Sequence, residues 1–149
     1  MKKALILGIV LLLIVGCSSS KKNEQKDKVL LCTVSDSAEG ISMTATLTYT
    51  FDSEGKKLQY EEVVLEVTYQ DTETIESDYD SLMEECNAIK YLNGVSCDVK
   101  MTGKKLTQIA TIDYLNSDKE TLDEISVITD YSYERLKSEY KNIETLSCE

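Results

Sequence analysis

The stretch Gly40-Ile-Ser-Met-Thr-Ala-Thr-Leu-Thr-Tyr-Thr-Phe51 carries the clearest structural pattern in the chain. From Met43 to Phe51, apolar side chains alternate with threonine, a period of two that is typical of an antiparallel strand with one buried and one solvated face. The turn Asp52-Ser-Glu-Gly55 follows, and Gly55 can take the positive φ that tight turns need. The sequence therefore predicts a half-buried strand that enters a hairpin.

The second arm of this hairpin is predicted from Leu58 to Tyr69. The alternation of its apolar side chains shifts by one residue along the strand. Leu58 and Tyr60 would point to one side of the sheet, and the later apolar side chains would point to the other: Val63, Leu65, Val67 and Tyr69. A β-bulge near Glu61-Glu62, or a strand covered on both faces for part of its length, would account for the change. A short strand, residues 29–34, and a loop, residues 36–40, are expected before the hairpin.

Helical patterns and a second hairpin follow. A helix is expected after Ser77 or Asp78, with one apolar face formed by Tyr79, Leu82, Met83, Cys86 and Ile89. The hairpin comprises residues 95–101 and 106–114, and a short helix over 116–126 would have the Ser117…Glu120 capping-box pattern. A last helix is expected over 131–143. The predicted fold class is α+β, a single domain of antiparallel β-hairpins, about five strands, packed with two to three helices.

The first twenty residues indicate export. Lys2 and Lys3 precede an apolar run over residues 4–15. Gly16 and Cys17 follow this run. A positive start, a short apolar core and a small residue at the cut are typical of a bacterial signal peptide, and the Cys after the small residue marks the lipoprotein kind. The apolar run spans roughly 18 Å, too short to cross about 30 Å of hydrocarbon; a buried helix is the alternative. We expect a signal peptide over 1–16, lipidation (diacylglycerol, palmitate) at Cys17, a polar tether over 17–28, and a domain over 29–149.

Four cysteines remain in that domain: Cys32, Cys86, Cys97 and Cys148. An even number in an exported chain predicts two disulfides, and four cysteines allow three pairings. The favoured pairs are Cys86–Cys97, which share the inward faces of a helix and the next strand, and Cys32–Cys148, which lie near the two ends of the domain. Zinc bound by four thiolates and free thiols are the alternatives, although no CxxC ligand pair is present.

Charge separates the tether from the domain. Lys21, Lys22, Lys26 and Lys28 sit near the lipid site, whereas residues 29–149 contain 10 basic and 25 acidic residues. A basic tether is attracted to anionic lipid headgroups, and an acidic domain is repelled by them. The acidic surface argues against a nucleic-acid partner, which needs a basic face. Its simplest consequence is solubility of the exported domain.

The residue types restrict the chemistry. The chain has no His and one Arg, Arg135, so Ser-His-Asp triads, Cys-His dyads and His metal sites are excluded by composition. Paired-carboxylate glycoside hydrolysis is not excluded by residue type, but close pairs arise by chance among so many acids. The acidic stretch over residues 71–80 has oxygen ligands for Ca²⁺ but fails the EF-hand pattern. Most of the nine Tyr fall on core phases rather than on a sugar-stacking surface.

The two hairpins carry a family resemblance. Gly40-Ile-Ser-Met-Thr-Ala-Thr-Leu-Thr-Tyr-Thr-Phe51 with Gly55-Lys-Lys-Leu58 resembles the small YehR-like bacterial lipoproteins. So does Gly94-Val-Ser-Cys-Asp-Val-Lys-Met101, with Gly103-Lys-Lys-Leu106 and Ile112-Asp-Tyr114. The resemblance covers about residues 29–146 and implies an α+β domain of unassigned activity, with no catalytic residues to transfer.

These observations favour a membrane-anchored extracytoplasmic lipoprotein that acts as a binding or interaction module. Its expected partners are membrane lipid, through the anchor, and an unknown envelope protein or small ligand. No cofactor, metal site or catalytic residue is predicted. A structural cell-envelope component without a ligand is the alternative, which a solid core would favour and a deep apolar pocket would disfavour.

Overall fold

The computed structural model describes residues 26–125 and 131–149. The predicted signal peptide, Cys17 and most of the tether lie outside these residues. In chain order the elements are β1 (Lys28–Ala38), β2 (Ile41–Phe51), β3 (Leu58–Tyr69), α2 (Ile75–Ile89), β4 (Val95–Thr102), β5 (Lys105–Asp113), α3 (Lys119–Ile125), α4 (Tyr133–Tyr140) and β6 (Leu146–Cys148). The strands form one antiparallel sheet in the order β4-β5-β3-β2-β1-β6. The α+β class is confirmed, with six strands rather than about five.

The first strand is longer than predicted. β1 pairs with β2 without interruption from Lys28↔Phe51 to Ala38↔Ile41, so the expected loop over residues 36–40 is wrong. Glu39 and Gly40 alone make the turn, with φ of 49° and 84°. Two successive positive φ values are the hairpin connection whose twist matches that of the strands, and this lets the pairing run to the turn.

The phase change in β3 comes from a β-bulge, the first of the two predicted explanations. Thr50 pairs with Tyr60 while Phe51 pairs with Leu58, so Gln59 is the extra residue of the bulge. The bulge therefore lies two residues before the expected position near Glu61-Glu62. Because the bulge precedes it, Glu61 has the same phase as the apolar side chains that follow and points into the core.

The helices begin and end at residues other than those predicted. α2 starts earlier, at Ile75, because this side chain is buried in the core. α3 is capped by Asp118, whose carboxylate accepts from the Thr121 backbone N–H at 2.8 Å, instead of by Ser117. This N–H holds the pKa of Asp118 below its usual value. α4 is shorter than expected and is capped by Ser132, which accepts from Arg135 N–H.

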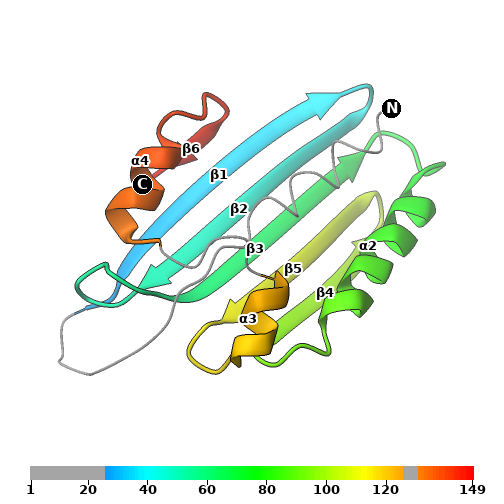
Figure 1. Ribbon diagram of the computed structural model, residues 1–149. Coiled ribbons are helices and arrows are strands. Elements are labelled where there is room, and N and C mark those ends of the chain that lie inside the picture. The colour runs from blue at the N-terminus through cyan, green and yellow to red at the C-terminus, as the bar shows by residue number, and fades with distance from the viewer. Residues whose placement is uncertain (1–25, 126–130) are drawn as a thin grey trace.

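The described helices α2, α3 and α4 lie on one side of the sheet (Figure 1). The inward side chains of the strands meet them in two core clusters, one centred on Tyr49 and Phe51, the other on Leu65 and Leu82. Within the described residues, no helix has the length and apolar character needed to cross a membrane. The other side of the sheet carries no helix in the described ranges.

Candidate functional site

A disulfide closes one edge of the sheet. Cys32 of β1 and Cys148 of β6 are directly paired residues, with Cα atoms 4.1 Å apart and a sulfur bond between them. Leu31 and Glu149 continue the pairing, since each donates its backbone N–H to the carbonyl of the other. The short strand β6 is thus held covalently against the edge of β1.

The second disulfide attaches the longest helix to the opposite edge. It joins Cys86 of α2 to Cys97 of β4, and the Gln108 side-chain amide lies 3.6 Å from the Cys86 sulfur. The two pairs are the ones that the sequence favours. Two disulfides in one small domain indicate an oxidising, extracytoplasmic location.

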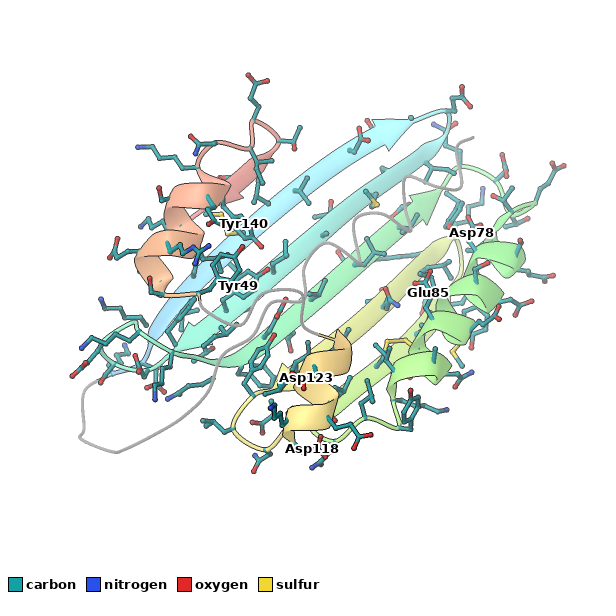
Figure 2. The ribbon with its side chains drawn as sticks, viewed as in Figure 1. Tyr49, Asp78, Glu85, Asp118, Asp123 and Tyr140 are labelled. Atoms are coloured by element: carbon teal, nitrogen blue, oxygen red, sulfur yellow. A yellow bond between two sulfur atoms is a disulfide. The ribbon has the colours of Figure 1, made fainter. Side chains whose placement is uncertain are left out.

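A buried carboxyl lies at the centre of the helix-covered face. Glu61 is 1% exposed, and the Tyr114 hydroxyl donates to its Oε2 at 2.7 Å. Tyr49 and Tyr140 lie close by and join their hydroxyls at 2.9 Å, as Figure 2 shows for these two side chains. The cluster links β2, β3 and α4 with Tyr114, the residue that follows β5.

Burial governs the acidity of these tyrosines. It raises the pKa values of Tyr49 and Tyr114 above the ordinary range, and the neighbouring Glu61 raises them further. Burial also raises the pKa of Tyr140, to about 12. The phenols therefore stay protonated at neutral pH and act as hydrogen-bond donors. Their hydrogen bonds run between elements, from Tyr140 of α4 to Tyr49 of β2 and from Tyr114 to Glu61 of β3, so the cluster holds α4 and the strands together.

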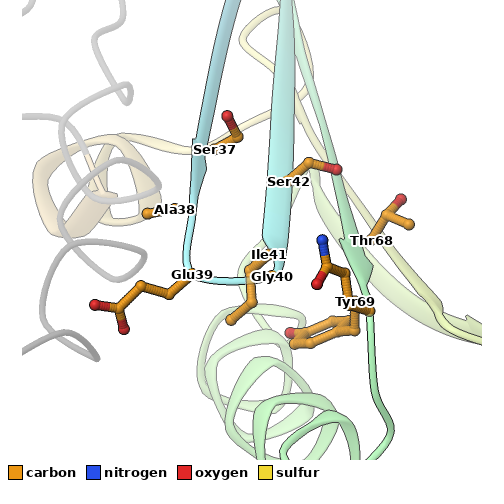
Figure 3. Close-up of a pocket in the computed structure, with 9 residues that line it drawn as sticks. Ser37, Ala38, Glu39, Gly40, Ile41, Ser42, Thr68 and Tyr69 are labelled. Atoms are coloured by element: carbon orange, nitrogen blue, oxygen red, sulfur yellow. The ribbon is translucent and has the colours of Figure 1, made fainter.

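A shallow pocket of about 280 Å³ lies at the β1–β2 turn (Figure 3). Its lining comes from the strand ends and the turn: Ser37, Ala38, Glu39, Gly40, Ile41, Ser42, Thr68, Tyr69 and Gln70. Most of these side chains are exposed, and the Tyr69 hydroxyl is engaged by Asp78 at 2.9 Å. The pocket lacks the enclosing apolar walls of small-molecule sites and is not the deep apolar cavity considered from the sequence.

The acidic stretch considered for Ca²⁺ is spread along a turn and a helix. Asp71, Glu73, Glu76 and Asp80 are exposed, whereas Asp78 faces β3 and accepts from Tyr69. In residues 26–125 and 131–149, no group of three or more Asp, Glu, Cys or His side chains could hold a metal ion. The structure therefore does not bring these carboxylates together.

Threonines cover the side of the sheet that the described helices leave open. Thr44, Thr46, Thr48 and Thr50 of β2 are half-buried on this side, as the alternation predicts. Thr46 has Val64 and Thr33 as its neighbours across the strands, and Val64 pairs with Ile109. The surface is flat, hydroxyl-rich and only weakly apolar at its centre.

The comparisons leave the family unassigned. No family model matches the chain, and no curated protein matches it. Among solved structures, the NMR structure of a protein from Streptococcus pneumoniae TIGR4 is similar to 91% of this chain and 94% of that one, with a TM-score of 0.48 and 15% identity. The YehR-like resemblance stays a prediction.

The sequence predictions missed two features of the site. The burial of Glu61 is not predicted, since a bulge near Glu61-Glu62 is one predicted explanation of the phase change; the signal for its burial is that Glu61 shares the phase of Val63 and Leu65. Residues 146–148, for which no strand is predicted, pair with β1 as a sixth strand. Three residues carry too little pattern to predict a strand.

Proposed function

We propose that the chain is a lipid-anchored, extracytoplasmic interaction module that receives an extended segment of an envelope protein at the β4 edge of its sheet. The anchor is the lipid expected at Cys17, and the tether would hold the domain above the membrane. The domain would be a YehR-like lipoprotein, as its two hairpins suggest.

A difference between the two ends of the sheet carries this proposal. At one end, the short strand β6 pairs with Cys32, Thr33 and Val34 of β1 and is bonded to β1 through Cys148. In the described part of the chain, the eight residues of β4 pair only with β5. Open edge strands invite pairing with another chain, so folded proteins usually protect them. An edge left open in a disulfide-fixed domain is a suitable place for strand addition, a common mode of peptide recognition.

Site-specific photo-crosslinking in intact cells tests the proposal. A photoreactive residue replaces Asp98 of β4 and, as the matched control, Ser147 of β6. Both side chains are exposed and both lie on edge strands. A discrete adduct from position 98 that position 147 does not form is the expected result.

A backbone variant then tests whether the adduct depends on strand pairing. Met101→Pro removes one N–H from the open edge, whereas Met101→Thr changes the side chain and keeps the N–H. The adduct should be lost with the first variant and kept with the second. Adducts formed equally from positions 98 and 147, or adducts between copies of this chain from many positions, would instead favour the structural-component alternative.

A further inference from the structure

The backbone of β4 has a regular set of groups that point away from the sheet. Asp113 donates its N–H to the Gly94 carbonyl at 2.8 Å, which marks this pair as hydrogen-bonded. Hydrogen-bonded pairs alternate along an antiparallel ladder, so Ser96, Asp98 and Lys100 also bond to β5. The residues between them, Cys97, Val99 and Met101, therefore direct their N–H and C=O groups to the open edge.

α2 lies beside this edge. The Cys86–Cys97 bond fixes the C-terminal part of the helix to β4. Asp78 is on the flank that faces β3, because it accepts from Tyr69. At 3.6 residues per turn, Tyr79 and Met83 lie about 100° and 140° further around the helix, on the flank toward the open edge. An added strand would thus pass between the edge of β4 and this half-buried flank.

A line of carboxylates borders the same flank. Glu76, Asp80 and Glu84 are spaced four residues apart, so they form one exposed stripe along α2. Residues 71–89 contain seven acids and no Lys or Arg. None of the ion pairs in the described ranges involves an acid of this segment.

Only the first member of the stripe helps the helix to fold. Glu76 lies in the first turn, where the helix dipole favours an acid, whereas Asp80 and Glu84 lie beyond it and like charges four residues apart repel one another. The last turn of α2 has no basic residue to offset it. A cationic partner would relieve this repulsion, whereas a second copy of the chain would bring two acidic helices together.

We infer that the segment received at the β4 edge is an extended, lysine- or arginine-rich strand of a partner protein, and this inference rests on the proposed function. Every second side chain of the strand would point to the α2 side. There a long cationic side chain lays its aliphatic stem on Tyr79, Met83 and the 44%-exposed Met101, and its charge reaches Glu76 and Asp80. The other side chains would extend the threonine-rich, uncovered side of the sheet.

Peptide binding to the full chain, with both disulfides intact, tests the inference. The probe is a capped eight-residue peptide of alternating Thr and Lys, and its charge-reversed control alternates Thr and Glu. We expect saturable binding of the lysine peptide only, with amide chemical-shift changes at Cys97, Val99 and Met101. Binding should weaken as salt is raised.

Two variant pairs separate charge from strand pairing. Glu76→Gln/Asp80→Asn should weaken binding about threefold to tenfold, whereas Glu134→Gln/Glu144→Gln, an equal charge change at exposed sites elsewhere, should not. Met101→Pro should weaken it about twofold to tenfold relative to Met101→Thr. Lysine peptides with N-methyl groups on alternate residues provide the same test without altering the protein, because one of the two registers should lose binding.

The outcomes are distinct. Equal binding of the lysine and glutamate peptides, or no binding of either, overturns the cationic partner but leaves the crosslinking test of the β4 edge intact. Binding that follows the Glu76/Asp80 charges and ignores both Met101→Pro and N-methylation overturns strand addition here. Binding of the lysine peptide that depends both on the Glu76/Asp80 charges and on the backbone N–H groups of the β4 edge supports the inference.

Discussion

The hydroxyl of Tyr114 lies 2.7 Å from Oε2 of Glu61, so a carboxyl that is 1% exposed receives a hydrogen bond from the residue that follows β5. A carboxyl in the core is tolerated only when such donors are present. The Tyr114–Glu61 hydrogen bond therefore stabilises a buried polar group in the core of the domain.

Removal of the donor should destabilise the domain. Tyr114→Phe leaves the Glu61 carboxyl without this hydrogen bond, and the free energy of unfolding should fall by about 1–3 kcal/mol in urea titrations. Tyr60→Phe, on the uncovered side of the sheet, is the control and should change it by less than about 0.5 kcal/mol. The double variant Glu61→Leu/Tyr114→Phe should recover part of the loss. Equal stability of Tyr114→Phe and wild type would mean that the bond does not support the core.

Alkaline pH should unfold the protein as buried tyrosines ionise. Burial raises the folded-state pKa values of Tyr49, Tyr114 and Tyr140, in the last case to about 12. A raised folded-state pKa gives stability that is complete below the unfolded value, about 10, and is lost as pH rises above it. Absorbance at 295 nm should show a group of tyrosines that ionise only together with loss of near-UV circular dichroism. Ionisation of all nine near pH 10 in a folded protein would contradict the buried network.

The two disulfides should contribute unequally. Cys32–Cys148 spans 116 residues and Cys86–Cys97 spans 11. In the loop-entropy model these separations correspond to about 5 and about 3 kcal/mol. Paired Cys→Ser variants should therefore differ in unfolding free energy by roughly 2 kcal/mol, with loss of Cys32–Cys148 the more severe. A larger loss on removing Cys86–Cys97 would show that local packing of α2 outweighs chain entropy.

Gly94 should tolerate no side chain. Its φ is 80°, and a Cβ there would lie 2.3 Å from Ser117 Oγ and 2.8 Å from the Asp113 carbonyl oxygen. Gly94→Ala should lower stability by about 2–5 kcal/mol, from backbone strain and overpacking together. Gly103→Ala is the matched control, because φ is 59° and nothing lies within 4 Å of its Cβ position. That variant should lose only about 1–2 kcal/mol. Similar thermal stability of the two variants would be evidence against the close approach at Gly94.

The long periodic segments of the fold were predictable. The threonine alternation over Met43–Phe51 places β2, its buried face and its hairpin partner, because a period of two has one simple structural solution. The apolar face of α2 and the inward phases of β4 and β5 also follow from sequence. The inward faces of α2 and β4 favour the Cys86–Cys97 pair, and the positions of Cys32 and Cys148 near the two ends of the domain favour the other pair, both of which the structure contains.

Tertiary context decides what the patterns do not. The bulge at Gln59 moves Glu61 into the core, and local sequence does not distinguish it from a bulge two residues later. The sequence pattern places Ile143 on the apolar face of the last helix. In the structure, however, α4 ends at Tyr140 and the Ile143 side chain is 45% exposed. The open β4 edge depends on sheet order, which single-strand patterns do not specify.

Incorporation of palmitate is the most direct test of the central claim, a domain held at the membrane by a lipid on Cys17. Cells are fed an alkyne analogue of palmitate, and the protein is recovered and reacted with a fluorescent azide. Wild type should be labelled and found with membranes, whereas Cys17→Ser should be unlabelled and released from them. An unlabelled wild-type protein, or a Cys17→Ser variant that still fractionates with membranes, would contradict the lipid anchor.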